Sequence, residues 1–99
     1  MVQINWTYQS RTDLEDIADY ISKDSVKYAR FQIFKIVSRT RILKKLPYSG
    51  KKLVELDRDD LRELIEGNYR IIYKIVTSSR IDILTIHHSS RDLKRRYLE

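Results

Sequence analysis

The sequence has 99 residues, of which 41% are hydrophobic, and it contains two glycines, one proline and no cysteine. This length predicts one domain spanning residues 1–99, and the lack of cysteine excludes a disulfide framework and a thiolate metal site. Twenty Lys and Arg against 14 Asp and Glu give a net charge of +6, which suits a nucleic acid or an acidic protein as partner, or simply a well-solvated surface.

The charges are unevenly distributed along the chain. Residues 35–52 contain seven basic residues and no acid, whereas residues 13–24 contain five acids and one lysine. One end of the molecule should therefore carry a positive field. The segment MVQINWTYQS lacks the regions of a secretion signal, and no apolar run approaches the roughly 20 residues that span a membrane. We therefore expect a cytoplasmic protein without a membrane partner.

The first predicted elements are a strand and a helix. Apolar and polar residues alternate over residues 2–7, which predicts a strand with Trp6 on its buried face. The apolar stripe over residues 14–21 has helical spacing. A capping box from Thr12 to Glu15 would begin this helix, and Ser10 is the alternative cap.

A second helix is predicted to follow after a very short connection. Asp24 or Ser25 can cap it, and an apolar stripe runs over residues 29–43. We expect it to end at Leu46, because the residue before Pro47 is pushed out of the helical region. The short connection predicts an antiparallel helical hairpin.

The rest of the chain is predicted to be mainly β-strand. Gly67-Asn68 between two apolar runs is typical of a β-hairpin turn. After a turn at 47–50, a short extended piece is expected at 52–55 and a loop at 57–60. Three strands are expected at 61–66, 69–76 and 80–88. The end of the chain, residues 89–99, is predicted to be one or two helical turns or a basic tail.

The order β-α-α-β-β-β predicts an α+β fold, with a helical hairpin packed on a small, largely antiparallel sheet. In the strand 69–76 the odd-numbered residues should face the core, while Arg70 and Lys74 lie on a mixed face that is open to a ligand. The expected core residues are Trp6, Leu14, Ile17, Ile21, Ile33, Val37, Ile71, Tyr73 and Ile83.

In order and spacing, these segments resemble the RelE/ParE toxin superfamily over nearly the whole chain. The resemblance rests on the strand with Trp6, the helix DLEDIADYI, and the segments LPYSGK, LRELIEGNYRIIYKI and HHSSRDL. It implies the toxin of a type II toxin–antitoxin pair, neutralised by a cognate acidic antitoxin. Members of the RelE kind cleave mRNA in the ribosomal A site, and members of the ParE kind bind DNA gyrase and are not known as nucleases. A degenerate toxin that only binds its antitoxin is a third alternative.

The RelE alternative needs groups that move protons and groups that hold a phosphate, without a metal or other cofactor. We predict a catalytic set of Arg70, His88, Arg91 and Tyr97, since the spacing of the last two resembles the pair near the end of RelE-type nucleases. RNA-binding or target-binding residues are predicted at Lys51, Lys52, Arg62 and Lys94. The chain departs from the RelE pattern at Ile65, where RelE-type enzymes have an arginine.

Each candidate also has a structural interpretation. His87 and His88 should point to opposite faces, and His88 is preferred because it alternates with Leu84 and Ile86. A histidine at a strand end is also typical of a structural group, and no metal site is expected. The structural interpretation of Arg62 is a simple pairing with Glu63 across the sheet edge.

Overall fold

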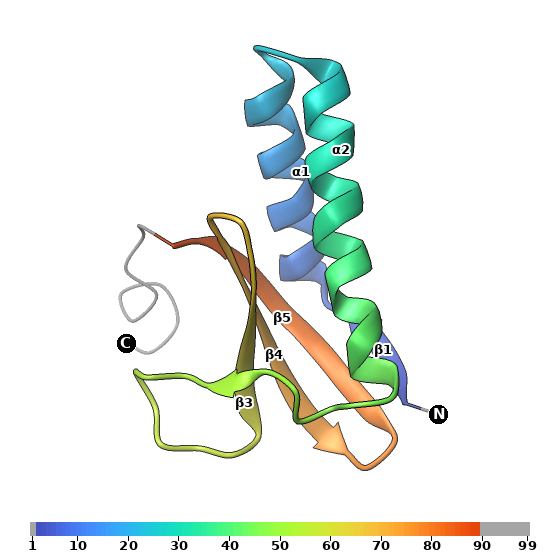
Figure 1. Cartoon of the computed structure of the whole chain (residues 1–99), viewed down its shortest axis with the longest axis vertical. Coiled ribbons are helices and arrows are strands. Elements are labelled where there is room, and N and C mark those ends of the chain that lie inside the picture. The colour runs from blue at the N-terminus through green and yellow to red at the C-terminus, as the bar shows by residue number, and fades with distance from the viewer. Residues whose placement is uncertain (1, 90–99) are drawn as a thin grey trace.

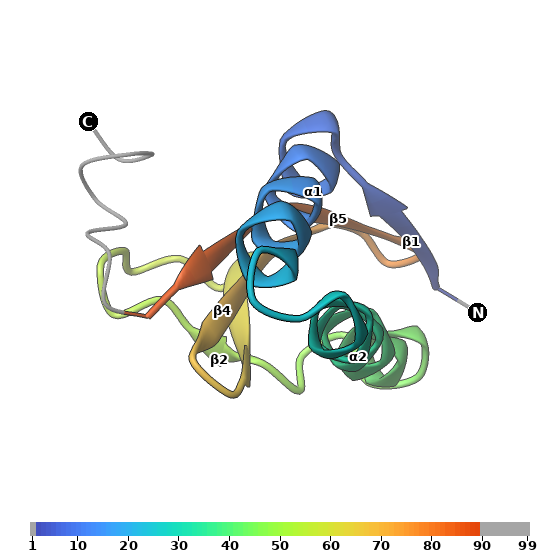
Figure 2. The ribbon, with the colours of Figure 1, turned by 90° about the horizontal axis from the view of Figure 1, so that it is seen from above.

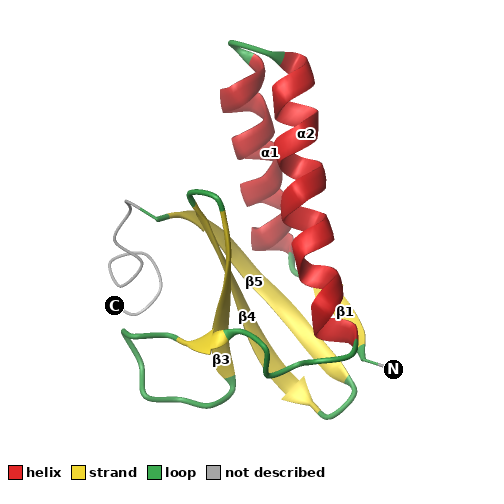
Figure 3. Ribbon diagram, viewed as in Figure 1, coloured by secondary structure: helices red, strands yellow, loops and turns green. Residues whose placement is uncertain are grey.

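The structure, a computed structural model, describes residues 2–89 and has two helices packed against one face of a five-stranded sheet (Figure 1). In chain order the elements are β1 (Gln3–Trp6), α1 (Tyr8–Ser22), α2 (Val26–Arg39), the 3-10 helix η1 (Thr40–Lys44), β2 (Lys51–Lys52), β3 (Leu61–Glu66), β4 (Tyr69–Thr77) and β5 (Arg80–His88). The sheet order is β1-β5-β4-β3-β2, with β1 parallel to β5 and the other pairs antiparallel. The predicted α+β fold is thus confirmed (Figure 3).

The helical hairpin is antiparallel, as predicted, and its far end extends beyond the sheet (Figure 1). Seen from above, α1 lies over β5, and α2 lies beside α1 (Figure 2). Ser25 is the cap of α2, and its hydroxyl accepts a hydrogen bond from the backbone nitrogen of Tyr28 at 3.0 Å. None of the helices between residues 2 and 89 has the length and apolar character needed to cross a membrane.

The predicted caps of α1 are wrong. The helix begins earlier, and its cap is Thr7, whose hydroxyl oxygen accepts from the Ser10 nitrogen at 3.2 Å. The same hydroxyl donates to the Ile83 carbonyl on β5 at 2.7 Å. This contact is 76 residues away in the sequence, so local pattern alone gave no sign of it.

The predicted end of the second helix is also wrong. Regular α-helix stops at Arg39, and the chain continues as a 3-10 helix through Lys44 rather than as one helix to Leu46. At the junction the Thr40 hydroxyl donates to the Val37 carbonyl at 2.7 Å. Threonine hydroxyls that bond to the preceding turn compete with the regular helix pattern, which accounts for the tighter geometry here.

The main core lies between the helices and the sheet. Ile71, Tyr73 and Ile83 are fully buried in it, and Trp6, Leu14 and Ile17 pack against its edge. The buried positions of α2 are Ala29, Gln32 and Ile36. The predicted core residues Ile33 and Val37 are only half-buried, so the helix is rotated slightly from the expected facing, and Ile21 on α1 is half-buried as well.

The opposite face of the sheet is covered as well. Leu53, Leu61 and Ile72 form a second buried cluster there, with Leu56 and Leu84 packed against it. Leu53 and Leu56 belong to residues 53–60, the segment between β2 and β3 that we call the strap. The expectation of an open mixed face is corrected, because the strap brings its own leucines onto the sheet.

Candidate functional site

The first candidate site is centred on Arg70, on the strap-covered face of β4. Its guanidinium meets both oxygens of Glu55, with Nη1–Oε2 at 2.8 Å and Nη2–Oε1 at 3.0 Å. Its Nε donates to Oε2 of Glu63 at 2.5 Å. Only 12% of the Arg70 side chain is exposed. The hydrogen bond to Glu55 raises the pKa of Arg70, so the guanidinium remains charged and paired.

The carboxylates around Arg70 come from two different elements. Glu63 lies on β3 and is 4% exposed, while Glu55 lies on the strap. The hydrogen bond from Arg70 lowers the pKa of Glu55 below its ordinary value. Lys51 on β2 approaches the second oxygen of Glu63, with Nζ–Oε1 at 3.8 Å. These four residues, which we call the arginine cluster, contain two positive and two negative groups and are neutral together.

The two histidines at the end of β5 point to opposite faces, as predicted. His87 pairs with Arg70 in the sheet register and is 2% exposed, whereas His88 pairs with Tyr69. Register partners in antiparallel strands share a face, so His87 lies on the face of the arginine cluster. His88 lies on the helix side, where its ring contacts that of Tyr69 edge-on, with centroids 5.5 Å apart. The structure does not bring His88 and Arg70 together.

A bulge in β5 decides this arrangement. The register passes from Thr85, opposite Ile72, to Ile83, opposite Tyr73, so Leu84 is the extra residue. An inserted residue reverses the facing of everything after it. Ile86 and His88 therefore share a face with Ile83, while Leu84 packs in the second cluster. The predicted common face of Leu84, Ile86 and His88 is wrong for Leu84.

Asp13 on α1 holds this bulge, a role that the sequence analysis missed. It is 4% exposed, and its Oδ2 accepts from the Thr85 hydroxyl and, at 3.0 Å, from the Ile86 nitrogen. Gln9 donates to the other oxygen at 2.8 Å. The position of Asp13 beside the apolar stripe of α1 could have indicated this role, because an acid that is buried needs hydrogen-bond partners.

Arg62 and Lys52 hold loops in place. Arg62 donates from Nη1 to the Gly50 carbonyl and from Nε to the Asp59 carbonyl, both at 2.9 Å, and its guanidinium lies 4.9 Å from the ring centre of Tyr48. Lys52 pairs with Asp59 at 2.9 Å. The alternative pairing of Arg62 with Glu63 is not observed, because Arg62 faces Tyr73 in the register while Glu63 faces Ile72.

Three predicted site residues, Arg91, Lys94 and Tyr97, lie outside the described residues 2–89. Within that range no group of three or more histidine or carboxylate side chains is arranged to hold a metal ion.

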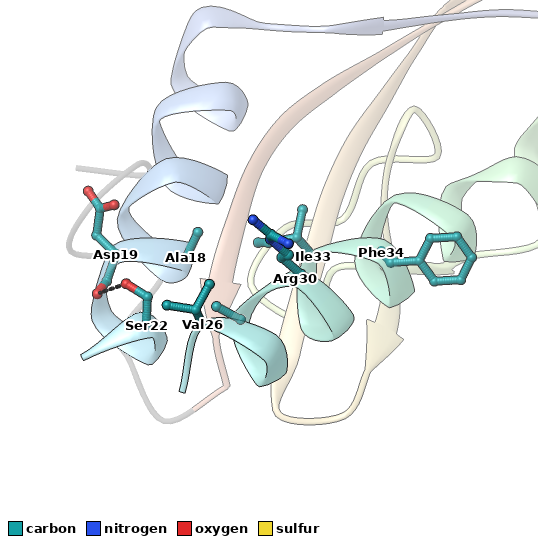
Figure 4. Close-up of a pocket in the computed structure, with 8 residues that line it drawn as sticks. Ala18, Asp19, Ser22, Val26, Arg30, Ile33 and Phe34 are labelled. Atoms are coloured by element: carbon teal, nitrogen blue, oxygen red, sulfur yellow. Dashed lines mark hydrogen bonds between the residues drawn. The ribbon is translucent and has the colours of Figure 1, made fainter. Parts of the chain in front are cut away.

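The second candidate site is a groove in the helical hairpin with a volume of about 530 Å³ (Figure 4). Ala18 of α1 and Val26 and Ile33 of α2 give it an apolar lining, and Asp19 and Arg30 add charge. We call this site the hairpin groove; the full lining is Ala18, Asp19, Ser22, Val26, Ala29, Arg30, Ile33 and Phe34.

The surface in and beside the hairpin groove carries several exposed apolar side chains of α2. Phe34 is 63% exposed and Phe31 is 54% exposed, and Val26 and Tyr28 are similarly open. The helix α2 also carries four basic residues and no acid in its sequence VKYARFQIFKIVSR. An exposed apolar patch beside basic side chains is typical of a protein-binding surface.

Residues 4–93 match the sequence profile of a family described as "ParE toxin of type II toxin-antitoxin system, parDE". The chain belongs to this ParE toxin family. It is therefore a toxin of a type II toxin–antitoxin module, in the wider RelE/ParE superfamily, with a cognate antitoxin as partner. A comparison with curated proteins gave no match.

Solved structures of toxins share the fold of this ParE-family chain. The chromosomal ParDE system of P. aeruginosa is 22% identical with a TM-score of 0.73, over 89% of this chain and 96% of that one. A YoeB/ParE toxin from Agrobacterium tumefaciens is 19% identical with a TM-score of 0.59, over 88% and 98%. The toxin–antitoxin complex RelBE2 from Mycobacterium tuberculosis is 25% identical with a TM-score of 0.51, over 88% and 96%. The fold is thus shared by ParE-named and RelE-named toxins and does not distinguish their activities.

Proposed function

We propose that this toxin arrests growth by binding a protein target, DNA gyrase, in the cytoplasm, and that it does not cleave mRNA. The observation that carries the proposal is the state of Arg70. Its guanidinium is neutralised by Glu55 and Glu63 and is 12% exposed. A group meant to stabilise a phosphate in a transition state must be free to meet it.

Two further observations support the gyrase proposal over the RelE-type alternative. His88, the proposed proton carrier, lies on the helix side of the sheet, away from Arg70. Ile65, which stands where RelE-type enzymes have an arginine, is an exposed apolar residue of β3. Within residues 2–89, Arg70 and His88 therefore lie on opposite faces of the sheet, which favours the gyrase proposal over a nuclease built on that pair.

The test compares two activities of the purified toxin. Gyrase supercoiling and mRNA cleavage on programmed ribosomes are measured side by side over the same toxin concentrations. We expect supercoiling to stop, with cleaved DNA trapped on gyrase, while mRNA remains whole. Codon-dependent mRNA cleavage without an effect on gyrase would overturn the proposal in favour of the RelE-type nuclease. Loss of both activities in a folded toxin that still binds its antitoxin would indicate the degenerate alternative.

We also propose that an acidic segment of the antitoxin docks along the hairpin groove and the exposed side of α2. The groove accepts apolar side chains beside Val26 and Ile33, and the aromatic rings of Phe31 and Phe34 continue the apolar surface. Amphipathic segments commonly bind such grooves through apolar anchors at helical spacing. The four cations of α2 would speed encounter with an acidic partner, while the buried anchors would supply most of the affinity.

A further inference from the structure

The first half of the strap, residues 53–56, reaches the sheet mainly through three side chains. Leu53 is 4% exposed and Leu56 is half-buried, and both pack with Leu61 and Ile72. Between these two leucines, Glu55 makes its two contacts with Arg70. Within the strap, the Leu56 nitrogen donates to the Leu53 carbonyl at 3.3 Å, a local turn rather than a strand pairing. Residues 53–56 are therefore attached to the sheet by two apolar contacts and one ion pair. The second half of the strap is held more firmly, because Asp59 pairs with Lys52 at 2.9 Å and the Asp60 carbonyl accepts from the Ile75 nitrogen of β4 at 2.8 Å.

The two carboxylates of the arginine cluster are not equivalent. Glu63 is fixed on β3, is nearly fully buried, and takes only the Nε of Arg70. Glu55 takes both terminal nitrogens with its two oxygens and lies on residues 53–56, which make no strand pairing. A phosphate presents two oxygens to an arginine fork in the same way as a carboxylate does. Glu55 thus occupies the position that an oxyanion ligand of Arg70 would take.

We propose that Arg70 and Lys51 form a latent binding site for a phosphate group, with Glu55 as its built-in competitor, and that the site opens when residues 53–56 of the strap lift from the sheet. With Glu55 in place the cluster is neutral. With Glu55 withdrawn, Arg70 and Lys51 outweigh Glu63 by one positive charge. This charge needs an anion, and the buried setting strengthens its attraction. His87, the register partner of Arg70, lies on the same face.

The latent site is independent of the gyrase proposal, since its test has a different readout. The experiment uses the full chain with Glu55→Gln, which keeps the size of the side chain and removes the competing charge. Asp57→Asn is the matched control, because Asp57 is a fully exposed strap carboxylate, 3.9 Å from Lys52, and its loss raises the net charge equally. Inorganic phosphate and a dinucleotide with a single phosphodiester are titrated at constant ionic strength, followed by the Arg70 Nε–H signal in NMR spectra.

We expect Glu55→Gln to bind inorganic phosphate or the dinucleotide at least tenfold more tightly than the wild type, with the Arg70 signal shifting on binding. Asp57→Asn should bind like the wild type. Phosphate binding alone would identify a site for a free or terminal phosphate, and dinucleotide binding would extend it to a nucleic-acid backbone. Equal affinity of Glu55→Gln and Asp57→Asn for both probes would overturn the proposal.

A second variant tests the strap without changing any charge. Leu56→Ala weakens the apolar attachment and leaves both carboxylates in place. We expect it to bind phosphate more tightly than the wild type but less tightly than Glu55→Gln. If Glu55→Gln does not fold, the phosphate affinity of Leu56→Ala is the test. A phosphate affinity of Leu56→Ala equal to that of the wild type would then overturn the proposal.

Discussion

The arginine cluster and the surface of α2 place their charges in contrasting settings. In the cluster, Arg70 is 12% exposed and held by two carboxylates. On α2, Phe34 is 63% exposed, and the basic residues of this helix lie among other exposed apolar side chains. The first region has the residue types of a catalytic site but the packing of a structural one. The second combines basic and exposed apolar side chains, and its exposure is that of a binding surface. In this molecule, the type of a charged residue therefore indicates its function less well than whether it already has ion-pair partners.

We expect the largest loss of stability on substitution of Arg70. Arg70→Ala leaves Glu63 buried without its main partner, and removing one member of a buried ion pair typically costs about 3–5 kcal/mol. We expect that loss in the free energy of unfolding measured in urea. The control is Arg30→Ala, an exposed arginine of α2 that should change stability by less than about 0.5 kcal/mol. Equal stability of the two variants would break the structural interpretation of Arg70.

The sequence predicted most of the elements because their signals are local. The strands over 61–66 and 80–88 were predicted with the observed bounds, and the turn between β3 and β4 was marked by Gly67, whose φ of 58° favours glycine. The candidate site was harder. Which groups surround Arg70 depends on the strap, and which histidine faces it depends on a bulge held by Asp13 from another element. Neither contact has a periodic signal in the sequence.

Asp13 gives the next largest effect. Asp13→Ala removes the acceptor for the Thr85 hydroxyl and the Ile86 nitrogen, both buried, and should cost about 2–3 kcal/mol of unfolding free energy. Asp16→Ala, an exposed acid on the same helix, is the control and should be nearly neutral. The difference in stability between these two variants measures how strongly Asp13 fixes the bulge, and with it the face of the sheet on which His87 lies. A loss below about 0.5 kcal/mol for Asp13→Ala would mean that the bulge persists without it.

On the binding side, Phe34→Ala should weaken antitoxin binding by about 2 kcal/mol, or about thirtyfold in Kd, because aromatic anchors carry much of an interface's energy. The stability of the free toxin should change little, since Phe34 is 63% exposed. The control is Tyr8→Ala, which removes another exposed aromatic at the first residue of α1, outside the lining of the hairpin groove. Isothermal titration with the purified antitoxin measures both. Equal losses for the two variants would exclude the hairpin groove as the docking site.

The smallest effect concerns pH. The hydrogen bond from Arg70 lowers the pKa of Glu55 below its ordinary value of 4.5. A lowered pKa means that the ionised carboxylate stabilises the fold above pH 4.5, and that this contribution is lost as pH falls through the lowered pKa. The wild type should therefore exceed Glu55→Gln in stability by about 1 kcal/mol at neutral pH. The difference should shrink below pH 4.5, and a difference that is constant down to pH 2 would contradict the ion pair.

The central claim, that Arg70 is held by ion pairs and is not an open phosphate site in the resting toxin, is tested most directly by NMR of the guanidinium in the wild-type chain. We predict that the Nε–H of Arg70 gives a separate, slowly exchanging signal, because it donates to buried Glu63. That signal should not move when inorganic phosphate is added at constant ionic strength. An Arg70 signal averaged with those of the exposed arginines, or one that shifts saturably with phosphate, would contradict the account.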